Sequence, residues 1–164
     1  MSDNLTHALA ELACSTNYEA FPPATIHKAK LHILDTLGAA IAGSASRETD
    51  AVVAMLGIQA GTGHSPIWGR PIASDARTSA FVNGVSAHAY ELDDSGGCDH
   101  SGAVVLPAVL AALGDRSQPL SGRELLRGVL LGYEVGRRVL EAVGGYEEHN
   151  GLGWHSTGTC GAFG

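Results

Sequence analysis

The sequence contains few cysteines, aromatic residues and basic residues. Its three cysteines, Cys14, Cys98 and Cys160, are far apart, and no two of them form a CxxC pair. An odd number of scattered cysteines argues against a disulfide framework and favours a cytoplasmic protein with reduced thiols. Aromatic residues make up 5% of the chain, while glycine occurs 22 times. Small residues let helices approach closely, so this composition favours packed helices over a β-sandwich.

The charge balance and the apolar segments exclude two classes of partner. The 17 acidic residues outnumber the 10 basic ones, the net charge is -7, and no Lys/Arg cluster occurs. We therefore expect no nucleic-acid surface. The longest apolar stretch, residues 102–114, is too short to span a bilayer and contains Pro107. The N-terminal segment lacks the basic and apolar regions of a signal peptide, so we expect no membrane partner.

Hydrophobic periodicity predicts an all-α fold. The 164 residues suffice for one domain or part of one, and 45% of them are hydrophobic. Apolar residues recur at spacings of three and four, which predicts helices over residues 4–13, 24–42, 50–59, 75–94 and 103–113 and a long helix from residue 121. Loops are expected over 61–74, 95–101 and 144–154, with a short extended piece at 66–68. We find no alternating pattern typical of strands.

Residues suited to helix ends mark several of these boundaries. Pro23 suits the first turn of the second helix, and Gly43 suits its C-terminal cap. Ser121 and Glu124 have the spacing of a capping box. The other N-terminal caps are expected from Ser46 or Thr49 and from Ser74 with Asp75.

Two histidines and three carboxylates gather in the segment AHAYELDDSGGCDH, as His88, Glu91, Asp93, Asp94 and His100. On a helix through this segment, positions 84, 88, 91 and 95 share a face, so His88, Glu91 and Ser95 project together. The glycine-rich loop that follows returns His100 toward them. Carboxylates near a helix C-terminus oppose the macrodipole, which favours a functional pocket. A solvated surface turn is the alternative.

Two histidines each stand just before an expected helix start. His100 precedes Ser101, and His155 precedes Ser156 and Thr157. The positive end of a helix dipole keeps an imidazole neutral and able to act as a base, and the free N–H groups bind carboxylates. The alternative is that each histidine is merely a capping or loop residue.

The same residues also allow a metal site, which the motifs disfavour. His88 and Glu91 have helical spacing for two ligands, and Cys98, Asp99 or His100 would add a third. However, the chain has no HExxH motif, no cysteine pair and no Asp-rich calcium loop. We therefore expect no metal. A phosphate-binding glycine loop and a GxSxG nucleophile elbow are also absent.

Five segments share their order and spacing with a known family. They read LDTLGAAIAG at 34–43, AFVNGVSAHAYELDD at 80–94, HSGAVVLPA at 100–108, GYEV at 132–135 and GWHSTGT at 153–159. Together they resemble the MmgE/PrpD family of 2-methylcitrate dehydratases, cis-aconitate decarboxylases and iminodisuccinate epimerases. Because several linked motifs match along the whole chain, this resemblance is more specific than any single motif.

The resemblance implies a fold and an assembly. It implies an all-α, multi-helix domain that carries most of the active site and is followed by a smaller α+β lid domain with catalytic lysines. Residues 1–164 then form the N-terminal part of the helical domain, and the lid lies outside this chain. A homodimer is expected, as is a native polypeptide heavier than the chain itself.

The resemblance also implies site residues. His100 and His155 fall on the family's catalytic histidines, Glu91 falls where Asp is usual, and Ser95 falls where Thr is usual. These four are the expected catalytic residues. Substrate is expected to contact His88, Asp93, Asp94, Ser101, Ser156 and Thr157.

The implied activity is a cofactor-independent lyase reaction on a small polycarboxylate, with histidines moving the proton. Dehydration of a methylcitrate-like substrate is the first expectation. Decarboxylation and epimerisation within the same family are the alternatives. A non-catalytic helical module that acts through its exposed apolar surface is the competing hypothesis.

Overall fold

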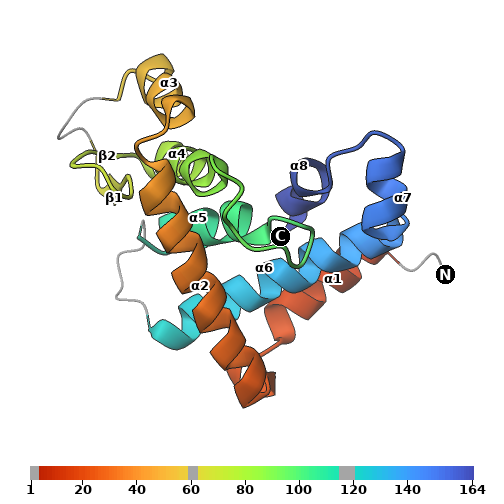
Figure 1. Cartoon of the computed structure of the whole chain (residues 1–164). Coiled ribbons are helices and arrows are strands. Elements are labelled where there is room, and N and C mark those ends of the chain that lie inside the picture. Colours follow the sequence, from red (N-terminus) through yellow and green to blue (C-terminus); the bar gives the residue numbers. More distant parts are fainter. Residues whose placement is uncertain (1–3, 59–62, 115–120) are drawn as a thin grey trace.

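A computed structural model describes residues 4–58, 63–114 and 121–164 as an array of packed helices with one very small hairpin (Figure 1). The helices are α1 (Leu5–Ser15), α2 (Pro23–Gly43), α3 (Arg47–Met55), α4 (Ala76–His88), α5 (Ser101–Gly114), α6 (Gly122–Ala142), α7 (Gly145–Gly151) and α8 (Ser156–Cys160). Single 3-10 turns occur at Tyr18–Ala20 and Gly161–Phe163. The all-α prediction is confirmed. Within the described ranges, no helix is both long enough and apolar enough to cross a membrane.

Side chains cap the helix starts largely where the sequence predicts them. The Asn4 side chain accepts a hydrogen bond from the backbone of α1, and Ser46 does the same for α3. Asp75 caps α4 through the N–H groups of residues 77 and 78. Ser121 and Glu124 form the complete capping box of α6. These local bonds satisfy N–H groups that have no partner inside the helix.

Helix α4 is shorter than predicted. It ends at His88, six residues before the predicted end at residue 94. The φ angle of Glu91 is +52°, which no right-handed helix contains. Beyond the helix, the side chains of Asp93 and Asp94 are buried among partners from other elements. These tertiary contacts override the helical pattern of the local sequence.

Two other predictions differ from the structure. The predicted loop 144–154 contains α7, whose buried His149 bonds the Thr159 hydroxyl at 2.7 Å and ties this polar, glycine-flanked helix to α8. The predicted extended piece is β1 (Ser65–Pro66), which pairs antiparallel with β2 (Ala73–Ser74) so that Ser65 faces Ser74. Residues 59, 61 and 62, in the predicted third helix and the next loop, lie outside the described residues.

Helices α2, α4 and α5 pack through small residues. Ala40, Ala87 and Ala103, one from each helix, form a buried cluster against Trp68. At Gly43 a Cβ atom would overlap the carbonyl oxygen of Ser86, and at Gly84 it would come within 2.8 Å of the Ala103 carbonyl. Close helix–helix contact therefore requires glycine at these positions. It brings the C-terminal end of α4 beside the start of α5.

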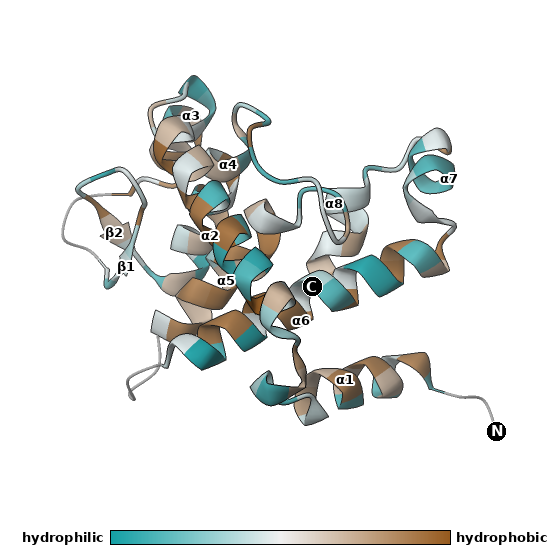
Figure 2. Cartoon of the chain, turned by 60° about the horizontal axis from the view of Figure 1, so that its bottom comes forward, coloured by the Kyte–Doolittle hydropathy of each residue, from teal (hydrophilic) through white to brown (hydrophobic). Residues whose placement is uncertain are grey.

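Helix α6 runs below α4 and α5 in Figure 1, crosses α2, and packs against the N-terminal helix α1. Figure 2 shows apolar and polar residues alternating along α6, as expected of a helix buried on one side. The Arg127 guanidinium donates hydrogen bonds of 2.6 Å to the carbonyls of Ala13 and Thr16, at the C-terminal end of α1. Near the other end of α6, Leu140 packs with Cys98 and Cys160.

The two glycines of α2 give a matched test of this packing. Gly43→Ala should lower the free energy of unfolding by about 1–3 kcal/mol, because the new methyl group forces α2 away from α4. Gly38 has open space around its Cβ position, so Gly38→Ala should instead raise the unfolding free energy by about 0.5–1 kcal/mol through better helix propensity. Chemical denaturation measures both. Equal effects of the two substitutions would contradict the close contact at Gly43.

Candidate active site

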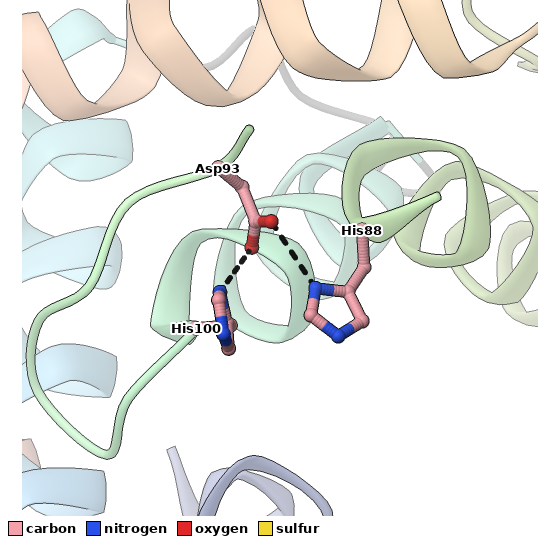
Figure 3. Close-up of side chains that lie close together, drawn as sticks. All are labelled: His88, Asp93 and His100. Carbon is pink, nitrogen blue, oxygen red and sulfur yellow. Dashed lines mark hydrogen bonds and ion pairs between the residues drawn. The ribbon is translucent and has the colours of Figure 1, made fainter. Parts of the chain in front are cut away.

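The carboxylate of Asp93 lies between two imidazole rings, one at the end of α4 and one just before α5 (Figure 3). His88 is the last residue of α4, and His100 directly precedes α5. Asp93 Oδ1 is 3.1 Å from His88 Nδ1, and Asp93 Oδ2 is 3.2 Å from His100 Nδ1. The ring centroids of the two histidines are 4.4 Å apart. The Asp93 side chain is fully buried, so a carboxylate charge there must be stabilised by neighbouring groups such as these two rings.

One of these two contacts is incomplete. His88 Nδ1 and Asp93 Oδ1 form a hydrogen bond. Asp93 Oδ2 and His100 Nδ1 face each other, but neither atom has a hydrogen-bond partner among the described residues. Two buried polar atoms left without a hydrogen bond are costly in a folded protein and are common at functional sites.

His155 stands at the edge of this cluster. It is the N-terminal cap of α8, and its Nδ1 accepts the N–H of Gly158 at 3.2 Å. That bond fixes Nδ1 as the acceptor, so Nε2 carries the proton when the ring is neutral. The centroid of its ring lies 6.4 Å from that of His88, and the side chain is exposed. The structure thus brings three of the predicted site histidines together.

Asp99 connects the loop between α4 and α5 to α8. It was not among the predicted active-site residues. Its Oδ2 accepts hydrogen bonds from the hydroxyls of Ser156 at 3.1 Å and Thr157 at 3.5 Å. The backbone N–H of His100 donates to the Thr157 hydroxyl at 3.2 Å. Asp99 adopts a φ of +97°, which is unusual for a residue with a side chain. Its position directly before His100 was the only signal in the sequence.

Asp94 points away from Asp93 and anchors the loop to the body of the domain. Its Oδ1 accepts the N–H of Gly102 at 3.0 Å, in the first turn of α5. Its Oδ2 accepts the Tyr133 hydroxyl at 2.7 Å and lies 2.6 Å from His32 Nδ1. Burial, together with the charge of Asp94, raises the pKa of Tyr133 far above its usual value, so the hydroxyl remains a donor. Tyr133 and His32 were missed as partners because no local pattern connects residues so distant in sequence.

Glu91 and Ser95 lie apart from the buried carboxylate. Glu91 is exposed, and its Oε1 is 3.8 Å from His88 Nε2. Ser95 is exposed on the other side of the loop, where it lines a cavity of about 230 Å³ with Lys28 and His32. The predicted common helical face of His88, Glu91 and Ser95 does not form, because α4 ends at His88.

Ser101 and the helix starts are already engaged within the protein. The Ser101 hydroxyl is buried and accepts the backbone N–H of Cys98 at 2.8 Å. The N–H groups of Gly102 and Gly158 donate hydrogen bonds to Asp94 and His155, as described above. The Ser156 N–H donates to Asn150 Oδ1 at 3.1 Å. A substrate carboxylate at either helix start would therefore meet N–H groups that already have acceptors.

An open groove of about 410 Å³ borders His88. Its lining also includes Phe81, Val85, Val104 and Thr157. The groove lies between α4 and α5, above the close contact at Gly84. It gives a small molecule access to the side of His88.

Comparisons with known proteins identify the family of the chain. Residues 7–164 match the model of the MmgE/PrpD N-terminal domain. Human cis-aconitate decarboxylase is 37% identical over 120 residues, covering 70% of this chain and 25% of that protein. The mouse cis-aconitate decarboxylase is 30% identical over 145 residues, covering 85% and 30%. That of Aspergillus terreus is 37% identical over 97 residues, covering 56% and 18%. The chain thus spans less than a third of these curated relatives.

The raised pKa of Tyr133 predicts a specific pH dependence of stability. The unfolded chain loses this proton near pH 10 whereas the folded chain keeps it. The contribution of Tyr133 is therefore fully present below about pH 10 and is lost as the pH rises further. We expect Tyr133→Phe to lower the unfolding free energy by about 1–3 kcal/mol at neutral pH, because Asp94 loses its hydroxyl donor.

Urea denaturation of the wild type and Tyr133→Phe from neutral pH to above pH 10 measures this effect, since other titrating groups cancel in the difference. The difference in unfolding free energy between the wild type and Tyr133→Phe should become smaller at high pH. Tyr146→Phe, at an exposed position, is the control and should change stability by less than about 0.5 kcal/mol. A difference that is constant with pH would contradict the role given to burial of Tyr133.

Proposed function

The chain belongs to the MmgE/PrpD family, and we propose that it supplies the histidine-bearing part of the active site of a lyase that acts on a small polycarboxylate. The observation that carries the proposal is the buried Asp93 carboxylate held between His88 and His100, with His155 beside them. The family match supports the class of reaction, and this geometry supports the choice of proton-transfer groups.

His100 is proposed as the central acid–base group. Asp93 faces its Nδ1 and favours the tautomer with the proton on that nitrogen, which leaves Nε2 as the base. When His100 takes a proton on Nε2, the buried carboxylate stabilises the imidazolium that forms. Asp93 is thus a positioning residue, and its second oxygen keeps His88 aligned at the same site.

His155 is proposed as the second proton-transfer group. Its Nδ1 is held by the backbone of α8, and the centroid of its exposed ring lies 6.4 Å from that of His88. A lyase reaction needs one group to take a proton and another to give one, or a single group that does both in turn. The hydroxyls of Ser156 and Thr157 then keep α8, and with it His155, in place through Asp99.

Decarboxylation is the branch that we place first. The relatives reported above are named cis-aconitate decarboxylases. Loss of CO2 from such a substrate leaves an electron pair on carbon, and an imidazolium of this cluster would protonate that carbon. Dehydration of a methylcitrate-like substrate and epimerisation stay predictions, as do the homodimer and the cytoplasmic location. Product analysis separates the branches, because only decarboxylation releases CO2.

The proposed role of His100 predicts a large kinetic effect in the complete polypeptide. His100→Asn should lower kcat about 100-fold to 10,000-fold, because a positioned general acid–base group is lost. NMR detection of product from cis-aconitate measures the rate. His27→Asn, at an exposed position on α2, is the control. Near-wild-type turnover in His100→Asn would remove His100 from the mechanism.

A comparison of carboxylates distinguishes Asp93 from Glu91. Asp93→Asn should lower kcat by about 100-fold or more, because the amide does not stabilise the His100 imidazolium. Glu91→Gln should cost less than about tenfold if its exposed carboxylate acts only through solvent beside His88. The same assay is used for both variants. A larger loss in Glu91→Gln would return the catalytic role to Glu91, as the family resemblance implies.

A further inference from the structure

We propose that His88, Asp93 and His100 bind a divalent transition-metal ion of the Zn²⁺ class. Each residue offers one ligand atom, and the three atoms lie within 4.8 Å of one another. Figure 3 shows a nitrogen of each ring directed at the Asp93 carboxylate, and these nitrogens are the two Nδ1 atoms. The three residues are termed the His–Asp–His cluster below.

The cluster offers three ligand atoms of the kind that a tetrahedral zinc site uses. Zinc binds imidazole nitrogen and carboxylate oxygen at about 2.0–2.2 Å, so neighbouring ligand atoms in a tetrahedral site are about 3.3 Å apart. The two nitrogen–oxygen distances in the cluster, 3.1 and 3.2 Å, involve different oxygens of Asp93, and the three ligand atoms lie within 4.8 Å of one another. The side chains must therefore turn toward one point for a single ion to contact all three residues. Three protein ligands leave a fourth position open.

The unpaired atoms of the cluster supply an independent argument. Asp93 Oδ2 and His100 Nδ1 are buried, 3.2 Å apart, and without a hydrogen-bond partner among the described residues. Both atoms carry an electron pair that can accept a proton or bind a cation. A cation between them would satisfy both atoms at once.

The surroundings of the cluster also favour a transition metal. His88 Nε2 is 3.8 Å from Glu91 Oε1, and His100 Nε2 is 3.8 Å from Asp99 Oδ1. Carboxylates near the outer nitrogen of a metal-binding histidine orient the ring and raise its basicity. Two nitrogens and one oxygen suit Zn²⁺ or Co²⁺, whereas Ca²⁺ and Mg²⁺ prefer sites made of oxygen atoms. Glu91 thereby gains a role that its exposed position does not otherwise explain.

The metal ion and the proposed reaction compete for the same ring. An ion on His100 Nδ1 occupies the position of a proton on that nitrogen and blocks the tautomer proposed for proton transfer. The ion is therefore an inhibitor rather than a cofactor; this consequence rests on the proposed function, whereas metal binding itself does not.

Titration with Co²⁺ tests the binding without any assay of activity. The complete polypeptide, stripped of metal by a chelator, is titrated while visible absorption reports ligand-field bands and equilibrium dialysis reports stoichiometry. Wild type should bind one more equivalent of Co²⁺ than Asp93→Asn or His88→Ala, with loss of the tetrahedral spectrum in both variants. His27→Ala, which removes an exposed histidine on α2, should bind as wild type does.

Circular dichroism establishes whether each variant is folded. If Asp93→Asn does not fold, the comparison of wild type with His88→Ala tests the metal site. Equal stoichiometry and spectra in wild type and the folded site variants would overturn the metal site. Zn²⁺ inhibition is then measured separately. An active enzyme that binds no Co²⁺ refutes this inference alone, while Co²⁺ binding by a protein inactive on polycarboxylates refutes the proposed function alone.

Discussion

The buried carboxylate of Asp94 is the contact on which the site depends. It joins the first turn of α5, the Tyr133 hydroxyl of α6 and the His32 ring of α2 in one cluster. A buried charge with three partners holds them firmly, because each partner lost leaves the carboxylate less compensated. With Asp94 fixed inward, the preceding Asp93 projects to the other side, between His88 and His100. Of these two adjacent residues, Asp94 thus anchors the loop, and Asp93 faces the histidines of the proposed active site.

Close helix packing makes this division possible. The alanine cluster and the contacts at Gly43 and Gly84 bring α2, α4 and α5 together without large side chains between them. The last residue of α4 therefore lies beside the residue that precedes α5, although the intervening loop contains three residues with positive φ, of which two, Glu91 and Asp99, are not glycine. The strain in that loop is offset by the bonds of Asp94 and Asp99.

The two proposals rest on the same geometry. A carboxylate between two imidazoles can orient a histidine for acid–base chemistry, and it can also supply three ligands to a transition metal. The two proposed uses exclude each other because both need His100 Nδ1. An open groove lies beside His88.

The sequence by itself determined the helical class, most helix starts and the family. Periodicity and capping side chains are local properties, so Ser46, Asp75 and the Ser121–Glu124 box act where the pattern predicts. The sequence also indicated that His88, His100 and His155 belong to one site, which the structure brings together. Their chemical roles stay predictions.

Only the tertiary structure decided where α4 ends and which carboxylate meets the histidines. Local helical periodicity placed Glu91 on the face of His88, but burial of Asp93 and Asp94 breaks the helix before that face forms. Helix α7 was hidden by its glycines and polar residues, and its link to α8 depends on the buried His149. The contacts of Asp94 with His32 and Tyr133 join residues 62 and 39 positions apart, a proximity that arises only when three helices pack.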